Sequence, residues 1–137
     1  MQKGYEIIEH TADIGIRVKA ADLKGIFEKS ARAMFELIAE KKKKGLKKTV
    51  KIELEDDNLE ELFVSWLNEL LSLSAVKELI FSGFKIENLG NNNLSAKVEG
   101  SPVSNYKVHK EIKAATYHEL SLREISSGWQ AEVIFDV

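Results

Sequence analysis

The sequence predicts an α+β fold: a single domain of mostly antiparallel β-sheet packed with two amphipathic helices. The chain has 137 residues, of which 44% are hydrophobic and 31% charged, as is typical of one globular domain. Two stretches carry apolar residues at helical spacing, and segments of alternating pattern surround them. The last four of these segments are joined by short connections, which favours an antiparallel meander over parallel winding. We therefore treat residues 1–137 as one domain.

The first predicted helix begins after Asp22, which is a suitable N-cap, and ends near Glu40. Its apolar positions follow the period of a half-buried helix. They are Leu23, Ile26, Phe27, Ala31, Met34, Phe35 and Ile38.

The second predicted helix opens with Asp57 and Glu60 at the spacing of a capping box. Its apolar residues occupy one broad face, so this helix is also expected to be half buried. They are Leu59, Leu62, Phe63, Trp66, Leu67, Leu70 and Leu71.

Eight strands are predicted from alternating or β-branched segments that are bounded by turn residues. Their ranges are 4–9, 13–20, 47–55, 79–88, 93–99, 107–115, 117–125 and 129–137. Turn signals rich in Gly, Asn and Ser lie at 90–93, 100–102 and 126–128.

Composition excludes several classes of protein. The chain has no cysteine, so disulfides and thiolate metal sites are unavailable. No apolar run approaches the roughly 18 to 20 residues of a membrane span, and residues 1–5 lack the apolar core of a signal peptide. A cytoplasmic protein without a membrane partner is therefore expected. The formal net charge of −2 gives no overall field that would attract nucleic acid.

Three acidic groups are candidates for a metal site. The strand pattern at the C-terminus runs to Val137, so Asp136 and the α-carboxylate of Val137 are expected to be held close together. Asp13 interrupts a strand pattern near the other end of the chain. If the fold joins the two ends, three carboxylates converge, and their mutual repulsion favours a bound cation or a raised pKa. The ordinary alternative is that Asp13 caps a bend and Asp136 is a solvated strand-end residue.

Oxygen-only ligands suit Ca²⁺, Mg²⁺ or Mn²⁺ rather than zinc. Lys113 lies on the opposite strand face from its neighbours, where it could pair with the carboxylates, bind a phosphate as a point charge, or simply face solvent. His10 and His118 could add imidazole ligands. A lone histidine beside a strand is more often structural, so neither is placed in the metal shell.

Four segments together resemble the archease family, in matching order and spacing over nearly the whole chain. They are His10–Ile16, Trp66–Leu71, Ile112–His118 and Trp129–Val137. The resemblance implies a non-enzymatic accessory protein that acts on an RtcB-type tRNA-splicing RNA ligase. Such a protein promotes guanylylation of the ligase's active-site histidine and hence multiple turnover.

The resemblance also implies a divalent metal, commonly calcium, at Asp13, Asp136 and Val137. It favours a functional role for Lys113 beside these carboxylates.

The run from Lys41 to Lys48 is the one strongly basic stretch. It could contact RNA or an acidic face of the ligase, but such runs are usually solvated loops. No aromatic residues are interleaved to stack on bases.

Three functions remain open on these observations. The leading one is the ligase activator. A small metal-dependent phosphoryl hydrolase would use Lys113 to stabilise the transition state, but no nucleophile or phosphate-binding Gly-rich loop is evident. The third is a chaperone-like structural module, which would tolerate loss of Asp13 and Asp136.

Overall fold

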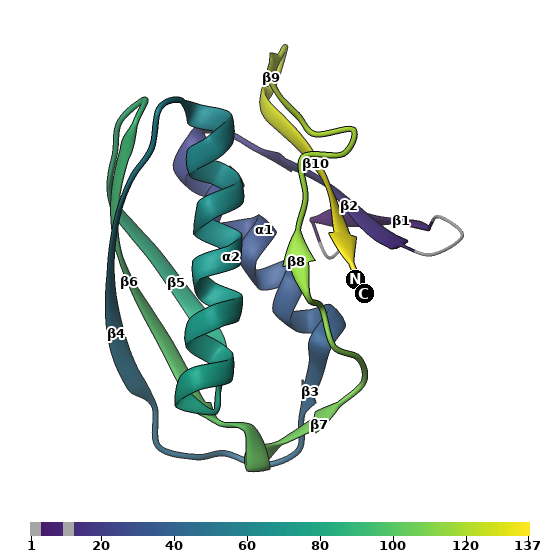
Figure 1. Cartoon of the computed structure of the whole chain (residues 1–137), viewed down its shortest axis with the longest axis vertical. Helices are drawn as coiled ribbons and strands as arrows, with labels where there is room; N and C mark the ends of the chain where they lie inside the picture. Colours follow the sequence, from purple (N-terminus) through teal and green to yellow (C-terminus); the bar gives the residue numbers. More distant parts are fainter. Residues whose placement is uncertain (1–3, 10–12) are drawn as a thin grey trace.

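The computed structural model describes residues 4–9 and 13–137, and these form ten strands, two α-helices and one 3-10 turn (Figure 1). The elements in chain order are β1 Tyr5–Glu9, β2 Asp13–Ala20, α1 Leu23–Ile38, β3 Ala39–Lys41, β4 Lys48–Glu55, α2 Leu59–Lys77, β5 Leu79–Leu89, β6 Asn93–Pro102, η1 Val103–Asn105, β7 Tyr106–Val108, β8 Ala114–Ala115, β9 Ser121–Ile125 and β10 Gly128–Asp136.

All strand pairs in the described residues are antiparallel, and they form three sheets. The largest has the order β1-β2-β10-β8, with β9 also paired to β10. A three-stranded sheet has the order β4-β6-β5, and β3 pairs with β7 in a small third sheet. The predicted α+β class with mostly antiparallel sheet is thus confirmed.

The helices fill the space between the two larger sheets. α1 contacts β5 of the three-stranded sheet and β2 of the five-stranded sheet, while α2 lies along the three-stranded sheet and reaches β8 (Figure 1). The rings of Phe27 and Phe63 meet edge to face at 5.1 Å between centroids, and the indole N–H of Trp66 donates to the carbonyl of Phe27 over 2.9 Å. Each of these three side chains is fully buried. The two helices therefore join the sheets through one core.

The helix boundaries differ from the prediction at two points, the end of α1 and the N-cap of α2. Asp22 caps α1 as expected, because its carboxylate accepts the N–H of Gly25 over 2.8 Å. However, α1 ends at Ile38 rather than Glu40, because the next three residues pair with β7 as strand β3. The capping box at Asp57 was wrong by one residue: Asn58 is the N-cap of α2 and accepts the N–H of Glu61. The same helix continues past Leu71 to Lys77.

The C-terminal strands were predicted least well. The range 107–115 contains two short strands, since residues 109–113 cross from the small sheet to the five-stranded one. In 117–125 only Ser121–Ile125 is a strand, and the N–H of Leu120 closes a turn onto Tyr117. The four-strand meander was also wrong, because β6 pairs with β4 and β5, and β8 and β9 both pair with β10. Alternation identifies a strand but not its partner.

No helix in the described part of the chain is long and apolar enough to cross a membrane.

Candidate functional site

The strand register places Asp13 directly opposite Asp136. β2 and β10 pair antiparallel over eight residue pairs, and Asp13 with Asp136 is the last of them. Directly opposed residues in antiparallel strands have side chains on the same face, with Cα atoms about 4.5 to 5.5 Å apart. Asp136 is exposed and Asp13 partly exposed. Two carboxylates from opposite ends of the sequence therefore meet at one end of the five-stranded sheet.

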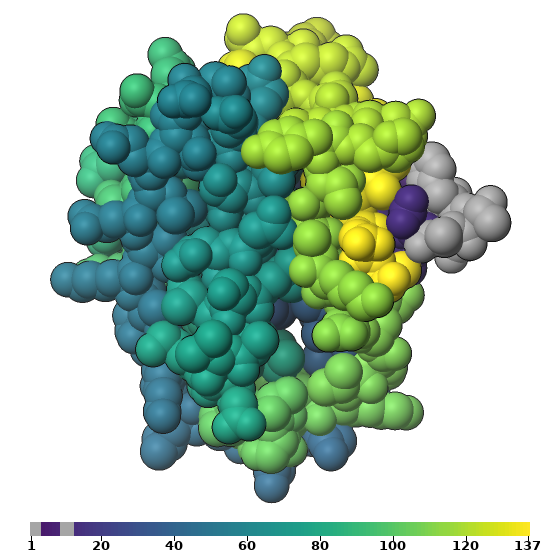
Figure 2. Space-filling view, viewed as in Figure 1, coloured from purple at the N-terminus to yellow at the C-terminus, as the bar shows by residue number. Residues whose placement is uncertain are grey.

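Val137 adds a third negative group at the same end. It follows Asp136 directly at the end of β10, so its Cα lies about 3.4 Å, one residue's rise, beyond that pair. The residue is 38% exposed. Figure 2 shows the yellow C-terminal end at the molecular surface, between the light green segment that precedes β8 and the purple N-terminal strand. We call Asp13, Asp136 and Val137 the carboxylate site.

Lys113 is held beside this site by its backbone. Its N–H donates to the carbonyl of Asp136 over 2.8 Å, and the next residue, Ala114, pairs with Asp136 in β8. The Lys113 side chain is exposed whereas Ile112 is buried, so the predicted alternation holds although these residues lie outside a strand. Backbone pairing thus brings all four predicted site residues to one place.

Asn68 of α2 holds β8 in position, a role that the sequence analysis did not assign to it. Its side-chain amide donates to the carbonyl of Ala115 over 3.1 Å, and its carbonyl accepts the N–H of Ala115 over 2.8 Å. The amide thereby occupies the edge of β8 as a neighbouring strand would. Thr116 adds two bonds from its N–H and hydroxyl to the carbonyl of Ile134. The signal in the sequence was an amide among the leucines of a buried helix face.

An ion-pair cluster crosses β2 and β10, which carry Asp13 and Asp136, and their neighbour β1. Arg17 of β2 lies between Glu6 of β1 and Glu132 of β10, and it forms hydrogen-bonded ion pairs with both. These pairs raise the pKa of Arg17, mainly through the hydrogen bond to Glu132. The cluster is partly exposed, so its contribution to stability is small. Arg17 is directly opposite both Glu6 and Glu132, so these ion pairs are compatible only with the register that aligns Asp13 with Asp136.

The donor set fits a hard divalent cation. Two side-chain carboxylates and one α-carboxylate supply only oxygen, the ligand that Ca²⁺, Mg²⁺ and Mn²⁺ prefer, and solvent can complete the shell at an exposed position. No group of three His, Cys, Asp or Glu side chains suitable for a metal is present within the described residues. At this site the α-carboxylate of Val137 would supply the third anionic ligand beside Asp13 and Asp136.

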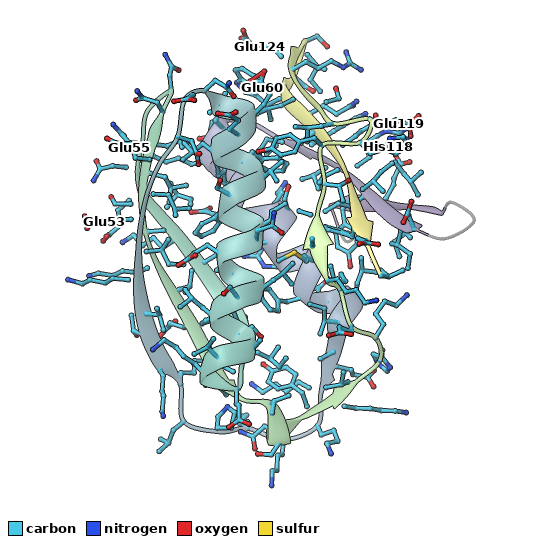
Figure 3. The ribbon with its side chains drawn as sticks, viewed as in Figure 1. Glu53, Glu55, Glu60, His118, Glu119 and Glu124 are labelled. Carbon is cyan, nitrogen blue, oxygen red and sulfur yellow. The ribbon has the colours of Figure 1, made fainter. Side chains whose placement is uncertain are left out.

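The remaining candidates lie elsewhere. His118 sits in the turn before β9, where its Nε2 is 3.8 Å from Glu119, and Figure 3 shows this pair at the surface. Its exclusion from the metal shell stays a prediction, and His10 lies outside the described residues. The run from Lys41 to Lys48 begins in β3, crosses a loop and ends in β4, at the lower end of the molecule in Figure 1.

A surface hollow of about 660 Å³ lies between the end of α1, β3 and β5. Arg32, Phe35, Phe81 and His109 are among its lining residues. None of the carboxylate-site residues lines it.

Fold and site together define a class: small α+β proteins in which the C-terminal strand pairs with an N-terminal one and brings acidic groups together. The model of the Archease protein family (MTH1598/TM1083) matches residues 5–137. The chain belongs to the archease family.

Curated relatives agree with this assignment. The chain is 36% identical to protein archease of Methanosarcina acetivorans over 98% of its own length and 97% of the relative's. It is 35% identical to protein archease of Pyrococcus furiosus over 97% of its own length and 98% of the relative's.

Two solved structures share the fold. The solution structure of Methanobacterium thermoautotrophicum protein 1598 superposes with a TM-score of 0.76 at 28% identity, covering 99% of this chain and all of that one. The crystal structure of an archease from Thermotoga maritima, described as a possible chaperone, superposes with a TM-score of 0.63 at 26% identity. The match covers 95% of this chain and 94% of that one.

Proposed function

We propose that this protein is a metal-binding accessory factor that activates an RtcB-type tRNA-splicing RNA ligase, promoting guanylylation of the ligase's active-site histidine and multiple turnover. The observation that carries the proposal is the pairing of Asp13 with Asp136, next to the C-terminal carboxylate and the backbone of Lys113. Family membership supports the same role. In this proposal the protein performs no reaction of its own and works in the cytoplasm.

Each residue has a separate task in this proposal. Asp13, Asp136 and the α-carboxylate of Val137 would hold the divalent cation, with calcium the implied ion and magnesium or manganese equally suited to oxygen ligands. A bound cation would offset the repulsion between the carboxylates and supply a positive charge for phosphate oxygens of the ligase's nucleotide. The exposed Lys113 side chain would add a second positive charge beside it. Asn68 positions Lys113 by holding β8.

The site is suited to act on a partner because it is exposed. Asp136 and Lys113 are exposed at the end of a sheet, and neither lines the hollow between α1, β3 and β5. An exposed group that carries a cation can contact another protein's active site, whereas an enzyme usually encloses its own substrate in a concave pocket.

Multiple-turnover ligation tests the proposal. A purified RtcB-type ligase with GTP and Mn²⁺ is assayed with wild-type protein, with Asp136→Ala and with Asp57→Ala, which removes an exposed acid elsewhere. We expect stimulation by wild type and by Asp57→Ala, and none by Asp136→Ala. Calorimetric titration with Ca²⁺ should show binding that Asp13→Asn abolishes. Equal stimulation by all three proteins would contradict the proposal.

A chaperone-like role is the second candidate, because the Thermotoga relative is described as a possible chaperone. It predicts that Asp13→Asn and Asp136→Asn together leave the protein's effect on its partner intact. Light scattering of a heated partner protein, with and without this protein, distinguishes the two functions. Suppression of aggregation by the double variant, together with unchanged ligase stimulation, would favour this second candidate.

A further inference from the structure

Eight exposed lysines gather at the end of the molecule where α2 finishes, and we call this surface the lysine end. They are Lys41, Lys42, Lys43, Lys44, Lys47, Lys48, Lys77 and Lys107. Six of them come from the basic run, whereas α2 and β7 supply the other two. Figure 1 shows the loop between β3 and β4 passing beneath the last turn of α2 and beside η1. The basic run is thus enlarged by lysines that lie far from it in sequence.

The positive charge of this surface is not neutralised within the protein. No salt bridge within 4.0 Å involves any of these eight lysines among the residues that the structure describes. Three acids lie nearby: Glu40 is opposite Lys107 and 3.8 Å from His109, Glu78 is at the C-cap of α2, and Glu99 is opposite Thr49, the neighbour of Lys48. Lysines therefore greatly outnumber acids here.

The lysine loop is attached to the body of the protein. The N–H groups of Lys42 and Lys43 both donate to the carbonyl of Asn105, over 2.9 and 3.3 Å. Gly45 packs so closely on Asn105 that an added Cβ would overlap that side chain. Asn105 itself is buried, with 8% exposure. Because the loop is anchored, its lysines lose less conformational entropy on binding than those of a free tail would.

Charge of the opposite sign collects at the other end of α2. Asp56, Asp57, Glu60 and Glu61 surround the start of this helix, and Figure 3 shows Glu53, Glu55 and Glu124 in the same half of the molecule. A helix of 19 residues is about 28 Å long, which exceeds the screening length of about 8 Å at physiological salt. A polyanion is thus attracted at one end only, which orients it on the protein.

We propose that the lysine end binds the phosphate backbone of RNA without reading its sequence. Lysine binds phosphate as a point charge, and counterion release from the nucleic acid supplies the driving force. A protein partner fits less well, because lysine is depleted in protein–protein interfaces, which are built around apolar or aromatic groups. Leu46 is the one large apolar side chain exposed within the loop itself. This proposal does not depend on ligase activation, since it uses none of the carboxylate-site residues.

Fluorescence anisotropy with a labelled single-stranded RNA tests this proposal on the full chain. The variant Lys42→Ala, Lys43→Ala, Lys44→Ala is compared with Lys19→Ala, Lys51→Ala, Lys85→Ala, which removes the same charge from exposed positions on both large sheets. Wild type should bind at about 50 mM salt and weaken steeply as salt rises. The first variant should bind RNA roughly tenfold or more weakly than wild type. The slope of log affinity against log salt concentration should become shallower by up to about three. The control should bind within twofold of wild type.

Three results would overturn the proposal. They are no RNA binding by wild type at low salt, equal loss in both triple variants, and binding that salt leaves unchanged. Vesicles containing phosphatidylserine, and polyglutamate, provide the comparison with other anionic partners. Binding to either of these but not to RNA would assign the surface to a membrane or to an acidic protein instead. Circular dichroism of each variant confirms that the fold is retained.

Discussion

The carboxylate site and the lysine end are both charged clusters, but they form in different ways. The first joins β2, near the start of the chain, to β10 at its end through a ladder of backbone hydrogen bonds. The second is mostly one contiguous run, anchored by a few bonds to Asn105. The comparison teaches that charge gathered by sheet register depends on the whole sheet, whereas charge carried by a loop depends on local contacts. Each should therefore respond to its own set of substitutions.

The largest effect is expected from extending the chain beyond Val137. A short Gly-Ser extension would convert the α-carboxylate into a peptide and remove one of three anionic ligands. Ligase stimulation should fall by more than tenfold, while the thermal midpoint and RNA affinity change little. The same extension fused to a chain that already carries Asp136→Ala serves as control, and it should cause no further loss. An extended protein that stimulates the ligase normally would remove Val137 from the site.

Asn68→Ala should weaken the carboxylate site indirectly, because Asn68 holds β8, the strand beside that site, in position. The substitution leaves the N–H and carbonyl of Ala115 without their partners, and the free energy of unfolding should fall by about 1 to 3 kcal/mol. Stimulation of the ligase should weaken, because β8 no longer holds Lys113 firmly. Urea unfolding checks the first expectation and ligation the second.

Asn88→Ala is the matched control, since its amide bonds only the exposed hydroxyl of Ser95 and its loss should cost less than about 0.5 kcal/mol. RNA binding should remain unchanged in both variants. Equal destabilisation by the two substitutions would contradict the bridging role of Asn68.

Gly45→Ala should disturb the lysine end alone. The new methyl group would overlap the side-chain nitrogen of Asn105, so the loop or that side chain must shift. We expect RNA affinity to fall a few-fold and the unfolding free energy to drop by up to about 1 kcal/mol, with ligase stimulation intact. Adding Asn105→Ala makes room for the methyl group, so the losses of unfolding free energy caused by the two substitutions should not add up in the double variant. Strict additivity would show that Gly45 and Asn105 do not interact.

The smallest expected effect is a change with pH in the stability that Tyr5 gives to the sheet carrying the carboxylate site. Burial and the hydrogen bond to Glu36 raise the pKa of Tyr5 above its ordinary value of 10.0. The unfolded chain therefore ionises first, so this stabilisation is complete below about pH 10 and is lost as the pH rises further. Unfolding by urea at successive alkaline pH values should show a shallower decline for Tyr5→Phe than for wild type.

Tyr117 contributes in the same direction, because burial and then Glu61 and Asp56 raise its pKa, but it is 57% exposed and its effect should be smaller. Tyr117→Phe is therefore the comparison variant. A decline with pH that neither substitution alters would assign the alkaline loss to other groups.

Local spacing in the sequence determined the two helices, the strand positions outside 107–125, and the family. The apolar period of α1, its cap at Asp22 and the bounds of β2 are all encoded within a few residues of one another, so they were predicted correctly. The segments around Asp13, Asn68, Lys113 and Asp136 carried the family resemblance. The lysine run was also evident in the sequence. That Lys77 of α2 and Lys107 of β7 lie beside this run was not.

Only the tertiary structure decided which strands pair and which residues support the site. The predicted meander was wrong because β6 joins β4 and β5, and residues 109–113 leave one sheet for another. The opposition of Asp13 and Asp136, the hydrogen bonds of Asn68 to β8 and those of the lysine loop to Asn105 link residues far apart in sequence. Side-chain alternation repeats every two residues and so specifies which face is buried, whereas the partner strand depends on packing of the complete core.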